Sequence, residues 1–131
     1  MTTVLVEGTA SGPLMVLSDP LSFWGGVDPA TGTIIDRSHP ALGESVAGMI
    51  LYMPSGRGSS SSASVIAETI RNGTGPLGFI LGEPDEIVVT GVYVANALYG
   101  TRVPVIVTEL PEDTEKPVLL NAAGARSVAA E

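Results

Sequence analysis

An unbroken run of apolar residues from 47 to 53 ends at Pro54 and leads into a stretch of glycine and serine. A run of this kind, bounded by a proline, is typical of a β-strand that is buried on both faces. After the serines, apolar residues recur at three- and four-residue spacing, at Ala63, Ile66, Ala67 and Ile70. With Asn72-Gly73 as a left-handed stop, this spacing predicts a helix over about 61–71. The chain therefore contains a strand, a glycine loop and a helix in succession.

Short apolar runs elsewhere predict further strands, at 4–8, 13–17, 77–81, 87–90 and 103–107, with a possible last strand at 118–120. We interpret 9–12 as the turn between the first two strands and 92–98 as a short helix that closes at Gly100. Pro104 either places its strand at an edge of a sheet or marks the beginning of the strand. These elements predict an α/β domain of the mixed α+β kind, with the helices packed on one side of the sheet.

The segment from 19 to 44 consists mostly of turn formers, and only 33–35 looks like a strand. So long a loop in a compact domain is more often a functional surface than a simple connection. Within it, Phe23 and Trp24 precede paired glycines, Gly25 and Gly26, which indicate an unusual backbone or a close approach to another group. Two interpretations stay open: the aromatic residues form a lid over a ligand pocket, or they plug the core.

The length of 131 residues, 44% of them apolar, predicts one domain over 1–131, with its core at about 4–107 and a partly loose tail at 109–131. The absence of cysteine excludes a thiolate nucleophile and any cysteine-based zinc or iron–sulfur site held by this chain alone. His39 is the only histidine, so a metal site in this chain would need several carboxylates, and we expect none. We expect the His39 ring to cap backbone in its own turn.

Six Lys and Arg residues against fourteen Asp and Glu residues give a formal charge of −8, and the basic residues are scattered along the sequence. This balance argues against nucleic acid and against anionic membrane surfaces as partners. No apolar run approaches the roughly 18–20 residues of a membrane span, and no signal peptide is evident. We therefore expect a soluble protein of the cytoplasm.

The loop at 56–62, with the sequence GRGSSSS, is the strongest candidate for a binding site. It joins the end of a buried strand to the start of a helix, where unpaired backbone N–H groups favour anions. Gly56 and Gly58 permit close approach of the backbone, and Arg57 offers a planar cation for a carboxylate or phosphate. The lysine of a P-loop is absent. The alternative is purely structural, a helix cap followed by a flexible turn.

Several motifs occur together in a fixed order: SFWGGVDP at 22–29, TG at 31–32, IID at 34–36, HP at 39–40, GES at 43–45, GRGSS at 56–60 and IVVTG at 87–91. As a set, over about residues 4–107, they resemble the small subunit of the aconitase X family. The resemblance implies a swivelling β/β/α three-layer domain, similar to the mobile domain of aconitases. Such a domain closes over an active site that lies mainly on a separate large subunit. The resemblance therefore implies that the two subunits form a heterodimer.

Members of that family dehydrate small hydroxy acids, either cis-3-hydroxy-L-proline or phosphomevalonate. The resemblance implies that iron, or an iron–sulfur cluster, lies on the large subunit and that this chain alone binds none. It assigns the proton-abstracting base to Ser59, the serine directly after Gly-Arg-Gly, with the following serines, Ser60 to Ser62, as alternatives. The residues that we expect to contact the substrate are Arg57, Gly58, Ser60, Gly25 and Gly26.

Two observations favour cis-3-hydroxy-L-proline over phosphomevalonate, which stays the alternative substrate. The segment 96–105 resembles the hydroxyproline form of the family. A substrate with both a carboxylate and a phosphate would need several cations, whereas the loop carries only Arg57. A function of another class also fits, a non-catalytic module that binds an anion or a partner protein through the same loop. A neighbouring gene for a large, cysteine-containing subunit would favour the enzyme.

Overall fold

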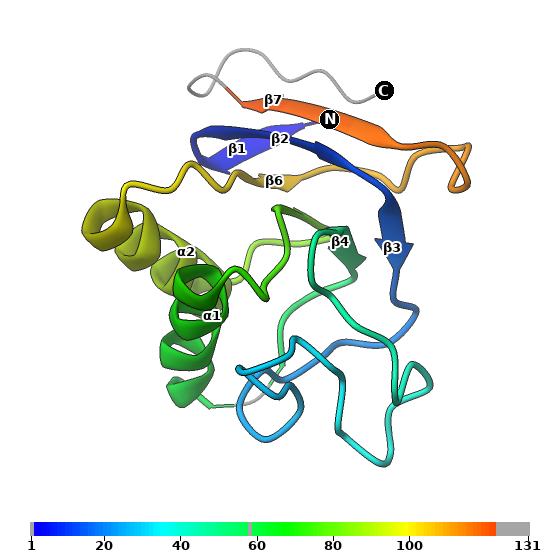
Figure 1. Cartoon of the computed structure of the whole chain (residues 1–131). Helices are drawn as coiled ribbons and strands as arrows, with labels where there is room; N and C mark the ends of the chain where they lie inside the picture. The colour runs from blue at the N-terminus through cyan, green and yellow to red at the C-terminus, as the bar shows by residue number, and fades with distance from the viewer. Residues whose placement is uncertain (1, 58, 123–131) are drawn as a thin grey trace.

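The computed structural model describes residues 2–57 and 59–122, which form two β-sheets and two α-helices (Figure 1). The larger sheet has the strand order β1-β6-β5-β4-β3. Its strands are β1 (Thr3–Val6), β3 (Leu14–Val16), β4 (Ile50–Met53), β5 (Gly78–Leu81) and β6 (Val105–Val107). The smaller sheet is an antiparallel pair of β2 (Gly8–Gly12) and β7 (Val118–Ala122). Helix α1 (Ser61–Asn72) connects β4 to β5, and α2 (Glu86–Tyr99) connects β5 to β6.

The domain has three layers: the small sheet, the large sheet and the pair of helices (Figure 1). Successive side chains of a strand point to opposite faces, so the central strands supply two cores. The core between the sheets consists of Ile50, Ile80, Ile106, Val118, Leu120 and Ala122. The core under the helices and the long loop receives Leu51, Phe79, Leu81 and Val105 from the large sheet. The predicted mixed α/β fold is thus confirmed, in β/β/α layers with the helices on one side.

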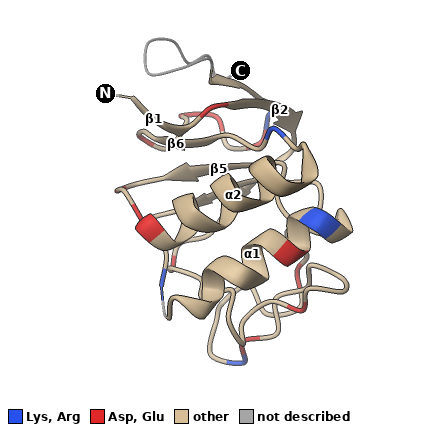
Figure 2. Cartoon of the chain, turned by 90° about the vertical axis from the view of Figure 1, so that its left-hand side faces the viewer, with Lys and Arg blue, Asp and Glu red and all other residues tan. Residues whose placement is uncertain are grey.

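One edge of the large sheet brings together the carboxyl ends of β4 and β5 and the starts of both helices, because β3, β4, β5 and β6 run parallel. Backbone pairing continues past the strand ends: the Gly82 amide donates to the Met53 carbonyl (3.2 Å) and the Glu83 amide to the Pro54 carbonyl (3.1 Å). The helices lie side by side on the sheet (Figure 2). Ligands of open parallel sheets bind at such an edge.

The predicted helix over 61–71 is confirmed as α1, and Gly73 ends it with a left-handed backbone, φ +74°. The strands expected at 4–8, 13–17, 47–53, 77–81, 103–107 and 118–120 are confirmed as β1, β3, β4, β5, β6 and β7, with slightly different ends. Because β6 lies inside the sheet, Pro104 marks the approach to a strand rather than an edge. Thr33 and Ile34 form only isolated bridges, with Ser45 and Val27.

The interpretation of 9–12 as a turn is wrong, because these residues belong to β2, which pairs with a strand from the far end of the chain. The glycines that suggested a turn have a packing reason instead. A Cβ at Gly8 would collide with the carbonyl oxygen of Arg102. At Gly12 it would lie 3.2 Å from the carbonyl oxygen of Gly48. Both glycines therefore allow close approach of backbones within a strand.

The strand expected at 87–90 is also wrong, since these residues form the first turn of α2, and the helix expected at 92–98 is correspondingly longer. The carboxylate of Asp85 caps α2 by accepting a hydrogen bond from the Val88 amide (2.9 Å). Val88, Val92 and Ala95 recur on its buried face at helical spacing. The β-branched residues favour a strand by composition, but the cap and this spacing determine the helix.

Candidate functional site

The glycine–serine loop leaves the carboxyl end of β4 and enters α1, with Ser59 and Ser60 exposed to solvent. Ser60 is the N-cap residue of α1, but its hydroxyl makes no capping hydrogen bond. Ser59 does this instead: its Oγ accepts a hydrogen bond from the Ser61 amide (3.1 Å), and its carbonyl accepts one from the Ser62 amide (3.0 Å). The Ser59 oxygen therefore lies at the positive end of the helix, in contact with a backbone N–H group.

The two aromatic residues of the long loop, Phe23 and Trp24, have different environments, so a single interpretation as lid or as core plug does not describe both. Phe23 is 1% exposed and packs against Phe79, with ring centroids 6.1 Å apart, so this residue plugs the core. Trp24 is 60% exposed. Its backbone amide donates to the Ser62 hydroxyl at the start of α1 (3.0 Å). The structure thus brings the exposed Trp24 beside the serine loop, although the two segments are far apart in the sequence.

The paired glycines after Trp24 have different environments. Gly25 is exposed and has a left-handed backbone, φ +74°. Gly26 is buried, and a Cβ there would collide with the carbonyl oxygen of Ser22. The Gly26 carbonyl also accepts a hydrogen bond from the Ile35 amide (2.9 Å). Of the two expected substrate contacts, Gly25 has an open surface, whereas Gly26 serves the packing of the loop.

The start of the glycine–serine loop is held by two neighbours. Gly56 forms a parallel bridge with Leu21, which ties the loop to the segment that contains Trp24. A Cβ at Gly56 would collide with the carboxylate of Asp85, the cap of α2. The glycine is required because the loop crosses this carboxylate closely. Gly58, a second expected substrate contact, lies outside the described residues.

Arg57 is exposed and forms no ion pair with any other residue that the structure describes. Its charge acts on Asp36. The pKa of the Asp36 carboxyl lies below its ordinary value, chiefly because the Ser38 hydroxyl (2.8 Å) and amide (2.9 Å) donate hydrogen bonds to it, and to a smaller degree because of Arg57 and His39. The guanidinium of Arg57 is therefore available to an anionic ligand, near a carboxylate that stays ionised at neutral pH.

His39 has the structural role that the sequence predicts. The side chain is only 6% exposed. Its Nδ1 accepts a hydrogen bond from the Ala41 amide (3.0 Å), and its Nε2 donates to the Asp19 carbonyl (3.3 Å), which can only accept. Both ring nitrogens are thus used by local backbone, which confirms that this histidine caps its own turn.

The sequence predicts no role for Ser22, and it predicts Ser62 only as the last of the alternative bases. Ser62 is 2% exposed, and its hydroxyl contacts Ser22 Oγ (3.2 Å) as well as the Trp24 amide. The spacing of the helix could have identified it. Ser62, Ile66 and Thr69 stand four and three residues apart on the buried face of α1.

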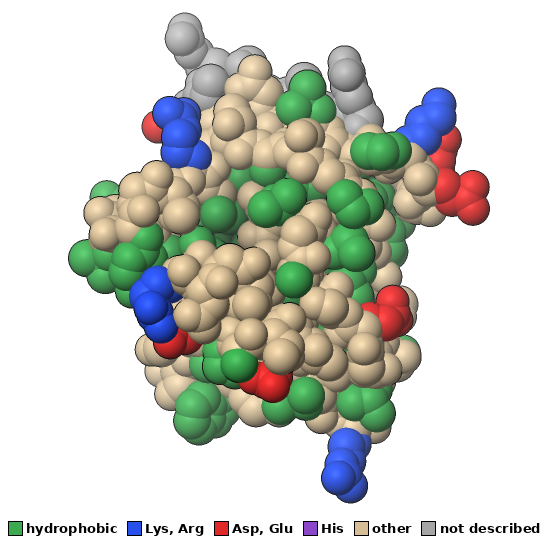
Figure 3. Space-filling view, viewed as in Figure 1, with side chains coloured by type: hydrophobic (Ala, Val, Ile, Leu, Met, Phe, Trp, Pro, Cys, Tyr) green, Lys and Arg blue, Asp and Glu red, His purple; other side chains and the backbone are tan. Residues whose placement is uncertain are grey.

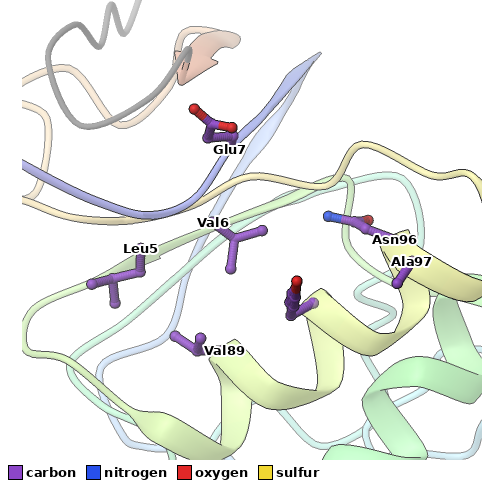
Figure 4. A pocket seen from close by; sticks show the side chains of 7 residues that line it. Leu5, Val6, Glu7, Val89, Asn96 and Ala97 are labelled. Carbon is purple, nitrogen blue, oxygen red and sulfur yellow. The ribbon is translucent and has the colours of Figure 1, made fainter.

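A separate groove of about 470 Å³ lies between α2 and β1, with Leu5, Glu7, Val89 and Asn96 among its lining residues (Figure 4). Its walls are mostly apolar and contain no Lys or Arg. None of the expected site residues lines it. A groove without a cation does not suit a hydroxy acid, so the candidate site is the serine loop.

Surface charge and metal-binding residues limit what the described part of the chain can hold. On the face shown in Figure 3, the Lys and Arg side chains stand apart and form no basic patch. Within residues 2–57 and 59–122, no three His, Asp or Glu side chains are grouped as a metal site. No helix in this part of the chain is long and apolar enough to cross a membrane.

Comparison with known proteins gives consistent results. A family model described as the aconitase X swivel domain matches residues 1–125. The cis-3-hydroxy-L-proline dehydratase of Hypocrea jecorina is 43% identical over 113 residues, which are 86% of this chain and 19% of that protein. The phosphomevalonate dehydratase small subunit of Methanothermobacter thermautotrophicus is 41% identical over 93 residues, 71% of each chain.

Among solved structures, the holo-form of Thermococcus kodakaraensis aconitase X matches with a TM-score of 0.83 and 32% identity. The match covers 100% of this chain and 98% of the matched chain. In contrast, this chain spans only about a fifth of the length of the Hypocrea jecorina relative.

Proposed function

Because this chain belongs to the aconitase X swivel-domain family, we propose that it is the small subunit of a dehydratase that acts on a small hydroxy acid. One observation carries the proposal. The hydroxyl of the exposed residue Ser59 accepts a backbone hydrogen bond at the positive end of α1, two residues after Arg57, which forms no ion pair with any other described residue. Relatives named as dehydratases support the reaction class.

Ser59 is the proposed base. As an alkoxide, its Oγ takes the proton from the carbon next to the substrate carboxylate. The electron pair of that C–H bond forms the new C=C bond, and the hydroxyl on the adjacent carbon leaves with the electron pair of the C–O bond. An aliphatic hydroxyl is almost wholly protonated at neutral pH, so the alkoxide needs stabilisation. The Ser61 N–H group (3.1 Å) and the helix dipole supply it from this chain.

The residues around Ser59 are proposed to bind the substrate. Arg57 holds the carboxylate, because a guanidinium can donate two parallel hydrogen bonds to it. Gly25 and Gly58 allow the substrate to approach the backbone, and the exposed Ser60 hydroxyl adds a donor. Together these groups would place the C–H bond of the substrate against Ser59.

The residues of this chain do not fit an iron centre. The sequence has no cysteine, and both nitrogens of its one histidine are engaged with backbone. We therefore assign any iron or iron–sulfur cluster of the enzyme to the large subunit, and we derive no step of this chain's chemistry through it.

For the substrate, we propose cis-3-hydroxy-L-proline rather than phosphomevalonate. Charge supports this choice, since Arg57 is the only cation in the loop from 54 to 62. The segment 96–105 begins near the carboxyl end of α2, where Asn96 binds Thr101 and Val103, about 16 Å along the helix from its cap at Asp85. That segment therefore supports the choice only through its resemblance to the hydroxyproline form.

The test is to reconstitute the chain with an aconitase X large subunit and to assay both compounds. We expect turnover of cis-3-hydroxy-L-proline. Preferential turnover of phosphomevalonate would correct the substrate and keep the reaction class. If the complex forms and dehydrates neither compound while the chain alone binds a small anionic metabolite or a partner, the chain is a non-catalytic module.

A further inference from the structure

We propose that Ser62 and Ser22 form a hydroxyl clamp that sets the position of Trp24 relative to Ser59, with Ser62 as a positioning residue for the reaction. The role in catalysis rests on the proposed function above. The clamp itself rests only on hydrogen bonds and burial within the chain.

The hydrogen bonds of the clamp close into a ring. The Trp24 amide donates to Ser62 Oγ (3.0 Å), and Ser22 Oγ donates to the Trp24 carbonyl (3.2 Å). The two hydroxyl oxygens are 3.2 Å apart. Because the single proton of Ser22 is used toward Trp24, the proton between the two hydroxyls comes from Ser62. Each hydroxyl thus donates once and accepts once, and both backbone polar groups of Trp24 are satisfied.

Ser62 connects this ring to the candidate base. Its backbone amide donates to the Ser59 carbonyl (3.0 Å), while its hydroxyl accepts from the Trp24 amide. One residue therefore makes hydrogen bonds to two peptide units, those of Ser59 and Trp24. No other described residue makes hydrogen bonds to both of these peptide units.

Burial explains why the clamp is rigid. Ser62 is 2% exposed, so water has little access to replace a lost partner of its hydroxyl. Closed chains of hydrogen bonds also polarise one another, so each bond of the ring strengthens the others. The indole of Trp24, in contrast, belongs to a residue that is 60% exposed. The clamp therefore holds the backbone of Trp24 at the start of α1 and leaves its side chain exposed to solvent.

Amide hydrogen exchange in the isolated full chain tests the clamp directly. In Ser62→Ala, we expect exchange of the Trp24 amide to speed up about fivefold to tenfold, because it loses its acceptor. The Ile35 amide, which donates to the Gly26 carbonyl and not to a hydroxyl of the ring, serves as an internal control and should not change. Ser61→Ala is the matched control variant, because Ser61 is an exposed neighbour in the same serine run.

A second pair of variants keeps the test valid if Ser62→Ala folds poorly. Ser22→Ala opens the same ring from the half-buried side and should also speed exchange at Trp24. The double variant should be little worse than Ser62→Ala alone, since Ser62→Ala already removes the acceptor of the Trp24 amide. Additive effects, or an unchanged Trp24 amide in both single variants, would overturn the clamp. Trp24 is the only tryptophan, so acrylamide quenching of its fluorescence provides a second readout.

The catalytic role is tested in the reconstituted complex. We expect Ser62→Ala to lower kcat about tenfold or more with little change in KM, because misplaced groups slow the chemical step rather than uniform binding. If Ser62→Ala speeds exchange of the Trp24 amide but keeps the kcat of the parent, the clamp exists without a positioning role. That result would overturn the catalytic part of the proposal. A parent complex that dehydrates neither compound contradicts the proposed function instead, and the exchange result still decides the clamp.

Discussion

Four consecutive serines in one loop have different tasks at the level of single residues. Ser59 and Ser60 are exposed, whereas Ser62 is buried and holds the Trp24 segment. The sequence alone cannot assign these different roles, because four identical side chains in a row give no signal that distinguishes one from another. Their place relative to the first turn of α1 decides which hydroxyl meets solvent and which meets the core.

Ser59→Ala should cost stability as well as activity, because the Ser59 oxygen accepts the Ser61 amide at the helix start. We expect the free energy of unfolding to fall by about 1 kcal/mol, the usual effect of losing a cap. Urea denaturation of the isolated chain measures it, with Ser61→Ala as a control that should change stability by less than about 0.5 kcal/mol. Equal stability of Ser59→Ala and the parent would show that this hydrogen bond is not a cap.

Asp36 gives a prediction about pH. Hydrogen bonds from Ser38 are the main reason for its lowered pKa, so Ser38→Ala should raise that pKa toward the ordinary value of about 3.9. In the parent, ionised Asp36 favours the folded state above the unfolded pKa, and this contribution disappears as the pH falls through the lower, folded value. Carbon NMR titration of the carboxyl group measures the shift. No change in Ser38→Ala would mean that other charges set the pKa.

At the level of secondary structure, the sequence predicts those elements whose signals are local. Helix α1 and strands β4 and β5 follow from periodicity, a glycine stop and unbroken apolar runs. Strand β2 escapes prediction because its partner β7 is distant in sequence and its glycines serve backbone packing. The start of α2 is misread because its β-branched residues favour a strand until the Asp85 cap is recognised.

In the candidate site, too, the sequence predicts the local features and misses the contacts between distant segments. The loop from 56 to 60 could be located from its position between a buried strand and a helix. Its contact with Trp24 could not be predicted, because that contact depends on how the long segment folds back against the start of α1. Only the buried spacing of Ser62 with Ile66 and Thr69 hints that this serine faces another segment.

The contact between the helices leads to a prediction at Gly91, in the middle of α2. A Cβ there would lie 2.7 Å from the Ala63 carbonyl oxygen and 3.0 Å from the Ile66 Cβ. Gly91→Ala would gain about 1 kcal/mol of helix propensity, but overpacking costs about 1–3 kcal/mol. We expect a net loss of stability in urea denaturation. A more stable variant would show that α1 and α2 move apart easily.

Ala97→Gly is the matched control for that prediction, because Ala97 is exposed on the same helix. This change should cost about 1 kcal/mol through helix propensity alone.

For the molecule as a whole, the three layers leave the edge with Ser59 and Arg57 at the surface, where a second subunit can cover it. The isolated chain should bind no iron in stoichiometric amount and should show no dehydratase activity, because it has no cysteine and its histidine is engaged with backbone. Co-expression with the large subunit should give both. Metal analysis of the purified chain and of the complex makes the comparison, and one equivalent of iron on the chain alone would refute this expectation.

The most direct test of the proposed function is the turnover rate of the reconstituted complex with Ser59→Ala in place of the parent chain. If Ser59 is the base, the rate with cis-3-hydroxy-L-proline should fall about a hundredfold or more, while the subunits still associate. Ser61→Ala in the same complex should stay close to the parent. A Ser59→Ala rate within about tenfold of the parent, a smaller loss than removal of a general base causes, would assign the base to another serine or to the large subunit.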